Sequence, residues 1–236
     1  MYRQFDEALA KLIKDIFDET LKGYRFITFQ LKRLHNIIVN RKTVLRYMNI
    51  LNIKSPIRKK RFQSCTQKET NEKARIVHHN VLARNFKATR PYHKLVTDVT
   101  YTYHKNGRLF LSVIKDLYDN SIVAYTVSKF NNNELVFRNI DLVFDDTWSQ
   151  TNVCILHSDQ GYQYTNLQYV KKLDNLGINI SHSRKANYYD NACCENFFSH
   201  LKSESLELNI PGNENELIDR IDEYIKWYNY DRPQEK

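Results

Sequence analysis

The sequence lacks any apolar run of about 18 residues, the length that a membrane-spanning helix needs. Its first residues, Met1 to Asp6, also lack the hydrophobic stretch of a signal peptide. The four cysteines show no Cys-x-x-Cys spacing, and no histidine accompanies them at zinc-finger spacing. These absences exclude a membrane anchor, a zinc finger and a disulfide framework. We therefore expect a soluble, cytoplasmic protein with reduced thiols and no membrane partner.

The net charge of +9 is distributed unevenly along the 236 residues. Residues 1–90 carry 21 Lys and Arg against 7 Asp and Glu, whereas residues 91–236 carry 15 against 20. This asymmetry favours a basic segment that grips a polyanion, attached to a segment that binds metal ions. The alternative is a basic surface that has no partner.

Apolar residues at helical spacing predict three helices in the first part of the chain, over residues 5–20, 27–35 and 41–51. Asn40 is a suitable N-cap for the third helix. The tight connection before it suggests a helix-turn-helix domain over residues 1–54, with Arg41, Lys42 and Arg46 directed toward DNA. A three-helix bundle without DNA-binding function would show a similar pattern.

Residues 55–90 show little apolar periodicity and predict a basic linker. The linker begins near Pro56 and contains a dense positive cluster. A segment of this composition can track DNA phosphates, or it can serve as a solvated tether. The residues of the cluster are Arg58, Lys59, Lys60 and Arg61.

From residue 91 onward the pattern predicts an α/β domain over residues 91–236. The predicted strands and helices alternate after three strands that are joined by short turns, one of which contains Asn106-Gly107. This order implies a mixed sheet flanked by helices. The predicted strands are 95–103, 109–117, 122–127, 153–159 and 178–180, and the helices are 132–145, 165–176, 190–202 and a C-terminal one.

Three carboxylates stand where packing alone would not place them. Asp98 interrupts a β-branched strand, Asp159 ends another strand, and Glu195 borders the apolar stripe of a helix. Two strand-borne aspartates and one helix-borne glutamate can converge on two divalent cations about 3.5–4 Å apart, which suits phosphodiester chemistry. Taken singly, each aspartate could instead be a hydrogen-bonded structural residue.

Several other polar residues are alternative candidates for the site or lie near these acids. Asn191 and Lys202 are predicted on the Glu195 side of its helix, where Lys202 can meet a DNA phosphate or remain a solvated lysine. His157 could orient Asp159, contact DNA or pack in the core. The rival acids, which we interpret as structural or turn residues, are Asp116, Asp119, Asp145 and Asp146.

Taken together, these segments resemble the DDE transposases of copy-out–paste-in insertion sequences, the OrfB-type relatives of retroviral integrases. The resemblance covers almost the whole chain. The D-x35-E spacing between Asp159 and Glu195 is its most specific part. The matching motifs are Thr97-Asp98-Val99-Thr100-Tyr101, His157-Ser158-Asp159-Gln160-Gly161, Ser183-Arg184-Lys185, Asp190-Asn191-Ala192, Phe197-Phe198, Leu201-Lys202 and Tyr228-Asn229-Tyr230-Asp231-Arg232-Pro233.

The resemblance implies a ribonuclease H-like fold in which Asp98, Asp159 and Glu195 hold two Mg²⁺ or Mn²⁺ ions. It implies two phosphoryl transfers, in which water frees a 3′-OH at the element's end and this 3′-OH then attacks a second strand. The implied partners are the terminal repeats, target DNA, further copies of the chain on paired ends and a helix-turn-helix protein from an upstream frame. We also expect Arg184, Lys185 and Asn191 to contact DNA.

The sequence departs from the family pattern at a few positions. Leu95 stands where Trp is usual, Ala186 where Gly is usual, and Pro233-Gln234 replaces Pro-His. The chain ends at Lys236, before the tail that we expect of the family. One alternative is therefore a truncated, inactive DNA-binding remnant or repressor of transposition. A ribonuclease H-type nuclease for hybrids would share the fold, but it predicts neither the helix-turn-helix nor the basic linker.

Overall fold

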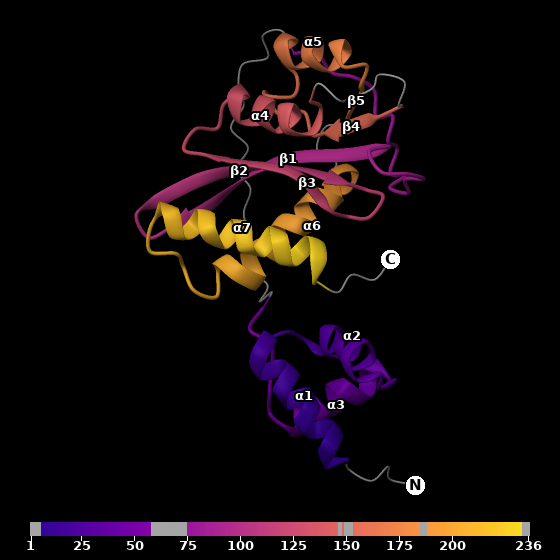
Figure 1. Ribbon diagram of the computed structural model, residues 1–236, viewed down its shortest axis with the longest axis vertical. Coiled ribbons are helices and arrows are strands. Elements are labelled where there is room, and N and C mark those ends of the chain that lie inside the picture. The colour runs from indigo at the N-terminus through magenta and orange to yellow at the C-terminus, as the bar shows by residue number, and fades with distance from the viewer. Residues whose placement is uncertain (1–5, 58–74, 146–147, 149–152, 185–187, 233–236) are drawn as a thin grey trace. The chain divides into compact units, whose positions relative to one another are not determined.

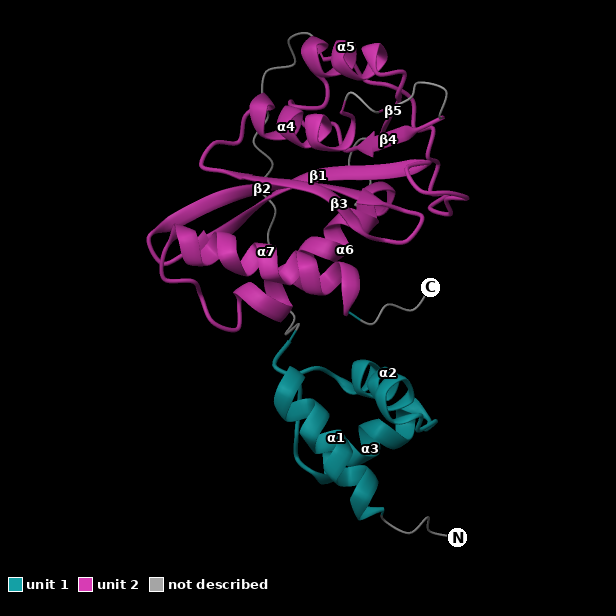
Figure 2. Ribbon diagram, viewed as in Figure 1, with its two compact units in different colours: residues 1–65, 232–236 teal, residues 66–231 magenta. Residues whose placement is uncertain are grey.

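The computed structural model describes residues 6–57, 75–145, 148, 153–184 and 188–232. The chain divides into two compact units, one formed by residues 1–65 with 232–236 and the other by residues 66–231 (Figure 2). Among the described residues, no helix combines the length and apolar character required to cross a membrane.

The first unit contains three helices, α1 (Glu7–Thr20), α2 (Tyr24–His35) and α3 (Arg41–Ile50). Asn40 caps α3 as predicted, because its side chain accepts a hydrogen bond from the Lys42 backbone N–H at 2.8 Å. All three predicted helices are present, although α2 begins at Tyr24, earlier than expected. Their apolar stripes meet in one small core whose fully buried members include Ile13, Ile27, Leu31 and Val44.

The second unit is built on a five-stranded sheet with the order β3-β2-β1-β4-β5 (Figure 1). The first three strands are antiparallel, whereas β4 pairs parallel to β1 and β5 parallel to β4. The predicted mixed sheet is therefore confirmed. The strands are β1 (Lys94–His104), β2 (Gly107–Asp116), β3 (Ile122–Ser128), β4 (Ile155–Ser158) and β5 (Asn179–His182).

Helices cover both faces of this sheet (Figure 1). On one face, α4 (Asn133–Val143) and α5 (Leu167–Asn175) pack on an apolar cluster that includes Leu95 and Ile114. On the other face, α6 (Ala192–Leu201) and α7 (Glu214–Tyr230) pack on a second cluster that includes Val96. Because alternate residues of β1 serve opposite faces, Asp98 lies on the α6 face, two residues after Val96.

Two short elements flank α6. A 3₁₀ turn, η1 (Tyr188–Asn191), precedes it, and a π-helical turn, η2 (Lys202–Leu206), follows it directly. Single π turns often mark functional sites because they change the direction in which a side chain points. Here the first residue of the π turn is Lys202, one of the predicted DNA contacts.

The predicted linker is wrong for residues 75–90, which belong to the second unit. Leu82 is 1% exposed within the α6 and α7 cluster, and its N–H donates to the Ser181 side chain at 3.1 Å. The backbone N–H of His78 donates to His182 at 2.9 Å. This segment forms neither a helix nor a strand, so its apolar residues follow no regular period that sequence pattern could detect. The basic cluster Arg58 to Arg61 lies outside the described residues.

Candidate active site

Asp98 lies where β1 loses one of its two neighbouring strands. β1 pairs with β2 from Leu95 to His104, but it pairs with β4 only from Lys94 to Val96. The edge of β1 that follows is open toward the end of β4. Asp98 sits on this stretch, half-buried, and its Oδ1 accepts a hydrogen bond from the Val99 N–H at 2.8 Å.

Asp159 directly follows β4 and begins a tight turn. Its Oδ1 accepts a hydrogen bond from the Gly161 N–H at 2.8 Å. A Cβ at residue 161 would lie 2.9 Å from the same oxygen, which is closer than real Cβ contacts. Glycine at this position therefore allows the turn to close around the carboxylate, in agreement with the position of Asp159 at a strand's carboxyl end.

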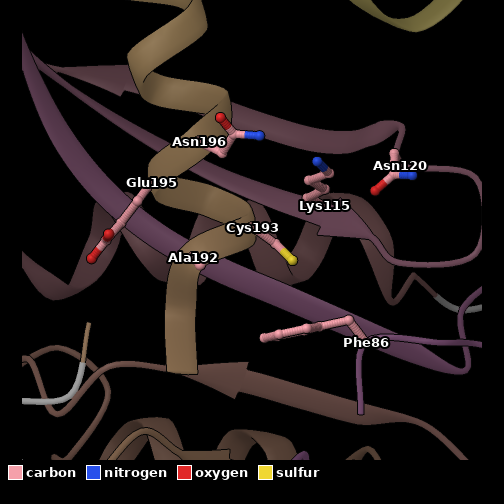
Figure 3. Close-up of a pocket in the computed structure, with 7 residues that line it drawn as sticks. All are labelled: Phe86, Lys115, Asn120, Ala192, Cys193, Glu195 and Asn196. Atoms are coloured by element: carbon pink, nitrogen blue, oxygen red, sulfur yellow. The ribbon is translucent and has the colours of Figure 1, made fainter. Parts of the chain in front are cut away.

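Glu195 projects from the exposed side of α6. The apolar stripe of this helix, formed by Cys194, Phe197, Phe198 and Leu201, is buried against the sheet as predicted. Figure 3 shows that the Glu195 carboxylate points away from Lys115 and Cys193, which line a pocket on the other side of the helix. Glu195 also borders this pocket, whereas neither Asp98 nor Asp159 does.

The three carboxylates interact electrostatically. Loss of surrounding water raises the pKa of Asp98 to about 8, and repulsion from Asp159 and Glu195 contributes to this rise. Partial loss of water also raises the pKa of Asp159, although the residue as a whole is exposed. The pKa of Glu195 is raised by partial burial and by the charge of Asp159. The three side chains therefore share one region of negative charge.

Lys202 is the cation that partly offsets this charge. Its Nζ donates a hydrogen bond to the Thr100 hydroxyl at 2.6 Å and lies 5.0 Å from the centre of the Tyr101 ring. Burial lowers the pKa of the amine, while the charges of Glu207 and Asp98 act in the opposite direction. The start of the π turn thus places Lys202 beside Asp98, close to the position that the sequence suggested.

The acids form no closed metal cage as they stand. In the part of the chain that the structure describes, no three His, Cys, Asp or Glu side chains lie together as a group that could hold a metal ion. The donors are nevertheless of the kind that Mg²⁺ and Mn²⁺ prefer, since all are carboxylate oxygens. Glu195 is exposed and therefore has the freedom to rotate.

Comparison with known proteins shows the family of the chain. Residues 4–61 match an HTH-like domain, and residues 88–188 and 195–235 match the integrase core domain. Over 227 residues the chain is 40% identical to the putative transposase InsK for insertion sequence element IS150 of Escherichia coli, covering 94% of this chain and 76% of that protein. The chain belongs to the insertion-sequence transposase family.

Further similarities agree with this assignment. An uncharacterized transposase-like protein of Haemophilus influenzae is 36% identical over 212 residues, covering 89% of this chain and 93% of that protein. A chain in a cryo-EM structure of the simian T-cell lymphotropic virus intasome matches 94% of this chain and 70% of its own length at 16% identity, with a TM-score of 0.51. The integrase core therefore has the expected ribonuclease H-like fold, preceded by a small all-α domain.

Two predicted DNA contacts of the integrase core are placed differently from the expectation. Arg184 uses Nε and Nη2, each at 3.0 Å, to bind Asp190. Asn191 is 4% exposed, and its Oδ1 has no hydrogen-bond partner among the described residues. In this conformation the Asn191 side chain is buried, and its contact with DNA remains a prediction. Lys185 lies outside the described residues.

Asp190 is the polar residue near the site that sequence reasoning missed. It is 1% exposed and also accepts hydrogen bonds from Arg84 Nε at 2.9 Å and Asn80 Nδ2 at 2.9 Å. Hydrogen bonds from Arg184 hold the pKa of this carboxyl well below its usual range. The network ties the predicted linker segment to the start of α6. No local signal could have found Arg84, because it lies 106 residues from Asp190.

The remaining candidates behave as structural residues or stay predictions. His157 is fully buried between the Ser181 and Ser183 hydroxyls, and burial lowers its pKa to about 4. Asp116 accepts backbone hydrogen bonds from Tyr92 and Tyr118, each at 2.8 Å, as expected of a structural acid. On α3, the predicted DNA contacts are exposed, and their role remains a prediction; they are Arg41, Lys42 and Arg46.

Proposed function

We propose that this chain catalyses metal-dependent cleavage and strand transfer of DNA at the ends of an insertion sequence. What supports the proposal is that Asp98, Asp159 and Glu195, three carboxylates from three separate elements, lie near enough for the charges of Asp159 and Glu195 to raise the pKa of Asp98. Family membership supports the same activity. The ligands would hold two Mg²⁺ or Mn²⁺ ions, since divalent cations supply the positive charge that the site lacks.

Bound ions would supply the chemistry that the protein groups lack, by activating the attacking oxygen and stabilising the leaving oxygen. The chain's own groups orient the ligands. The N–H groups of Val99 and Gly161 each hold one oxygen of an aspartate, which leaves the second oxygen available to a cation. The rigid strands β1 and β4 carry the aspartates, whereas Glu195 completes the set from the helix.

Positive side chains would position the DNA. Lys202 lies beside Asp98 and can neutralise a phosphate next to the reacting one. On the helix-turn-helix unit, Arg41, Lys42 and Arg46 would contact the duplex. The cluster Arg58 to Arg61 would add sequence-independent affinity. The proposed substrates are the terminal repeats and target DNA. The proposed protein partners are further copies of this chain on the paired ends and a helix-turn-helix protein from an upstream frame.

The test is a cleavage and joining assay on duplexes that end in the element's terminal inverted repeat. The full chain is incubated with Mg²⁺, with Mn²⁺, with Ca²⁺ or with a chelator. We expect nicking and strand transfer with Mg²⁺ or Mn²⁺, and loss of both in Asp98→Asn, Asp159→Asn and Glu195→Gln, with DNA affinity retained. Glu223→Gln is the matched control, because Glu223 is an exposed helix glutamate on α7.

Two results would decide against the proposal. Nicking that persists with a chelator, or in Asp98→Asn, would remove the metal site from the mechanism. Tight binding to terminal repeats without any metal-dependent nicking by the unaltered chain would instead support the alternative, a DNA-binding remnant or repressor of transposition.

A further inference from the structure

The open edge of β1 continues beyond Asp98 for several residues. Since β4 pairs only with Lys94 to Val96, residues 97–104 have no strand partner on that side among the described residues. An unpaired strand edge exposes backbone donors and acceptors and invites a binding partner. Here the edge leads directly away from a proposed metal ligand, so whatever binds there lies next to the reacting phosphate.

Two tyrosines stand exposed along this stretch. Tyr101 is 46% exposed and Tyr103 is 57% exposed, and their ring centres lie 5.4 Å apart with an interplanar angle of 69°. On β2, the residues opposite them are Phe110 and Arg108. Neighbouring exposed aromatic rings on one sheet surface are uncommon in a protein without a partner, because burial would stabilise them.

Cations lie over the rings of this surface. Lys202 Nζ is 5.0 Å from the centre of the Tyr101 ring, and the Arg108 guanidinium is 5.3 Å from the centre of the Phe110 ring. Alternating aromatic rings and cations match the chemistry of single-stranded nucleic acid, in which bases stack on rings and phosphates attract cations.

By alternation along β1, Tyr101 and Tyr103 lie on the face of the sheet opposite to Asp98, and the two faces meet at the open edge. Lys202 joins them there, because its Nζ contacts both the Thr100 hydroxyl and the Tyr101 ring. A strand that crosses this edge can therefore reach both the rings and the cleavage site. At about 3.3 Å per residue, Tyr101 lies about 10 Å and Tyr103 about 16 Å along the strand from Asp98. A DNA strand rises about 3.4 Å per nucleotide in a duplex, so these distances correspond to a few nucleotides. Stacking on a protein ring requires a base that has left its own duplex stack.

We propose that Tyr101 and Tyr103 form a stacking platform for unpaired DNA bases adjacent to the cleavage site, with Lys202 and Arg108 facing the phosphates. This inference rests on the proposed function, because it uses Asp98 to define where the DNA is cut. According to this inference, the open edge of β1 binds the unpaired end of the substrate strand. The metal site does not account for the binding of these bases.

The test compares the affinity of the full chain for two DNA duplexes of the same sequence, one blunt and one ending in a short dT overhang. Fluorescence anisotropy is measured with Ca²⁺ at fixed salt concentration, so that no cleavage occurs. The ratio of the two dissociation constants cancels the contribution of the helix-turn-helix unit. We expect the unaltered chain to prefer the overhang by about tenfold, since each stacked base contributes about that factor or more.

The double variant Tyr101→Ser with Tyr103→Ser should lose this preference, whereas Tyr101→Phe with Tyr103→Phe should keep it because the rings remain. Tyr230→Ser is the matched control, since Tyr230 is an 81% exposed tyrosine at the end of α7. A preserved preference in the serine variant overturns the inference, and so does an equal loss in the phenylalanine variant. The inference is also overturned if the serine variant sediments differently from the unaltered chain but keeps the same preference for the overhang. That result would show that the tyrosines form a contact between copies of the chain.

The outcome is separable from that of the proposed function. Overhang preference that depends on the rings, in a chain that does not nick DNA with Mg²⁺, would support the platform and reject the enzyme. Metal-dependent nicking without any overhang preference would support the enzyme and reject the platform.

Discussion

The acids beside α6 differ in how far nearby positive charges compensate their negative charge. At the start of the helix, Asp190 is covered by Arg84 and Arg184, and its pKa is lowered. One turn later, Glu195 belongs to a set that includes Asp98, and the pKa of each member is raised. The first acid is fully compensated and holds the structure together. The second set is only partly compensated, by Lys202, and such a residual negative charge is expected of a site that receives cations.

The largest effect should come from neutralising an acid of the partly compensated set. Asp98→Asn should lower metal-dependent nicking by about a thousandfold, which corresponds to about 4 kcal/mol of activation free energy. The same change should raise the melting temperature of the metal-free protein at pH 7. The folded pKa of Asp98, about 8, exceeds its ordinary value of 3.8, so its charge opposes folding as the pH rises between these values. Thermal unfolding with a chelator measures this, and a lowered melting temperature would contradict it.

The next effect concerns two histidines that the core keeps neutral. Burial lowers the folded pKa of His157 and of His182 to about 4, below the ordinary histidine value of 6.5. The stability that they contribute is therefore present above pH 6.5 and is lost as the pH falls toward 4, by at most about 3 kcal/mol for each. Denaturant unfolding of the integrase core across this range measures the loss. His157→Gln should reduce the slope by one proton, and an unchanged slope would contradict the assignment.

A smaller effect should come from neutralising the compensated acid, and its sign should be opposite to that of Asp98→Asn. Asp190→Asn weakens the bonds from two arginines, so it should lower the free energy of unfolding by about 2 kcal/mol. The estimate is modest because both guanidinium groups also face solvent. Melting temperatures of the two asparagine variants, measured side by side, test the comparison directly. A rise in both would show that Asp190 is not compensated as described.

The smallest effect should come from crowding one ligand. Gly161→Ala would place a Cβ 2.9 Å from Asp159 Oδ1 and 3.3 Å from Tyr164 Cδ2. The carboxylate must shift, so we expect about a tenfold loss of nicking, equivalent to about 1.4 kcal/mol, with little change in melting temperature. Gly23→Ala is the matched control, because nothing lies within 4 Å of a Cβ at residue 23. Equal activity of the two variants would remove Gly161 from the positioning of Asp159.

Local pattern predicted the helices and strands of the structure well. Alternation in β1 assigned Val96 and Leu95 to opposite faces, and the stripe on α6 left Glu195 at its border, as the structure shows. Pattern did not reveal that residues 75–90 pack on the core. Leu82 is held there by contacts with residues 99 positions away, and such contacts leave no trace in spacing.

The sequence alone predicts the catalytic candidates, the helix and strand periods and the charge asymmetry. Each of these features depends on residues that are near neighbours along the chain. The partner of each polar side chain does not. Arg184 was expected on DNA and is bound to Asp190, while Lys202 was expected beside the acids and lies there. The tertiary structure determines these pairings, because a charged side chain pairs with whichever group the sheet and helices bring within hydrogen-bonding distance.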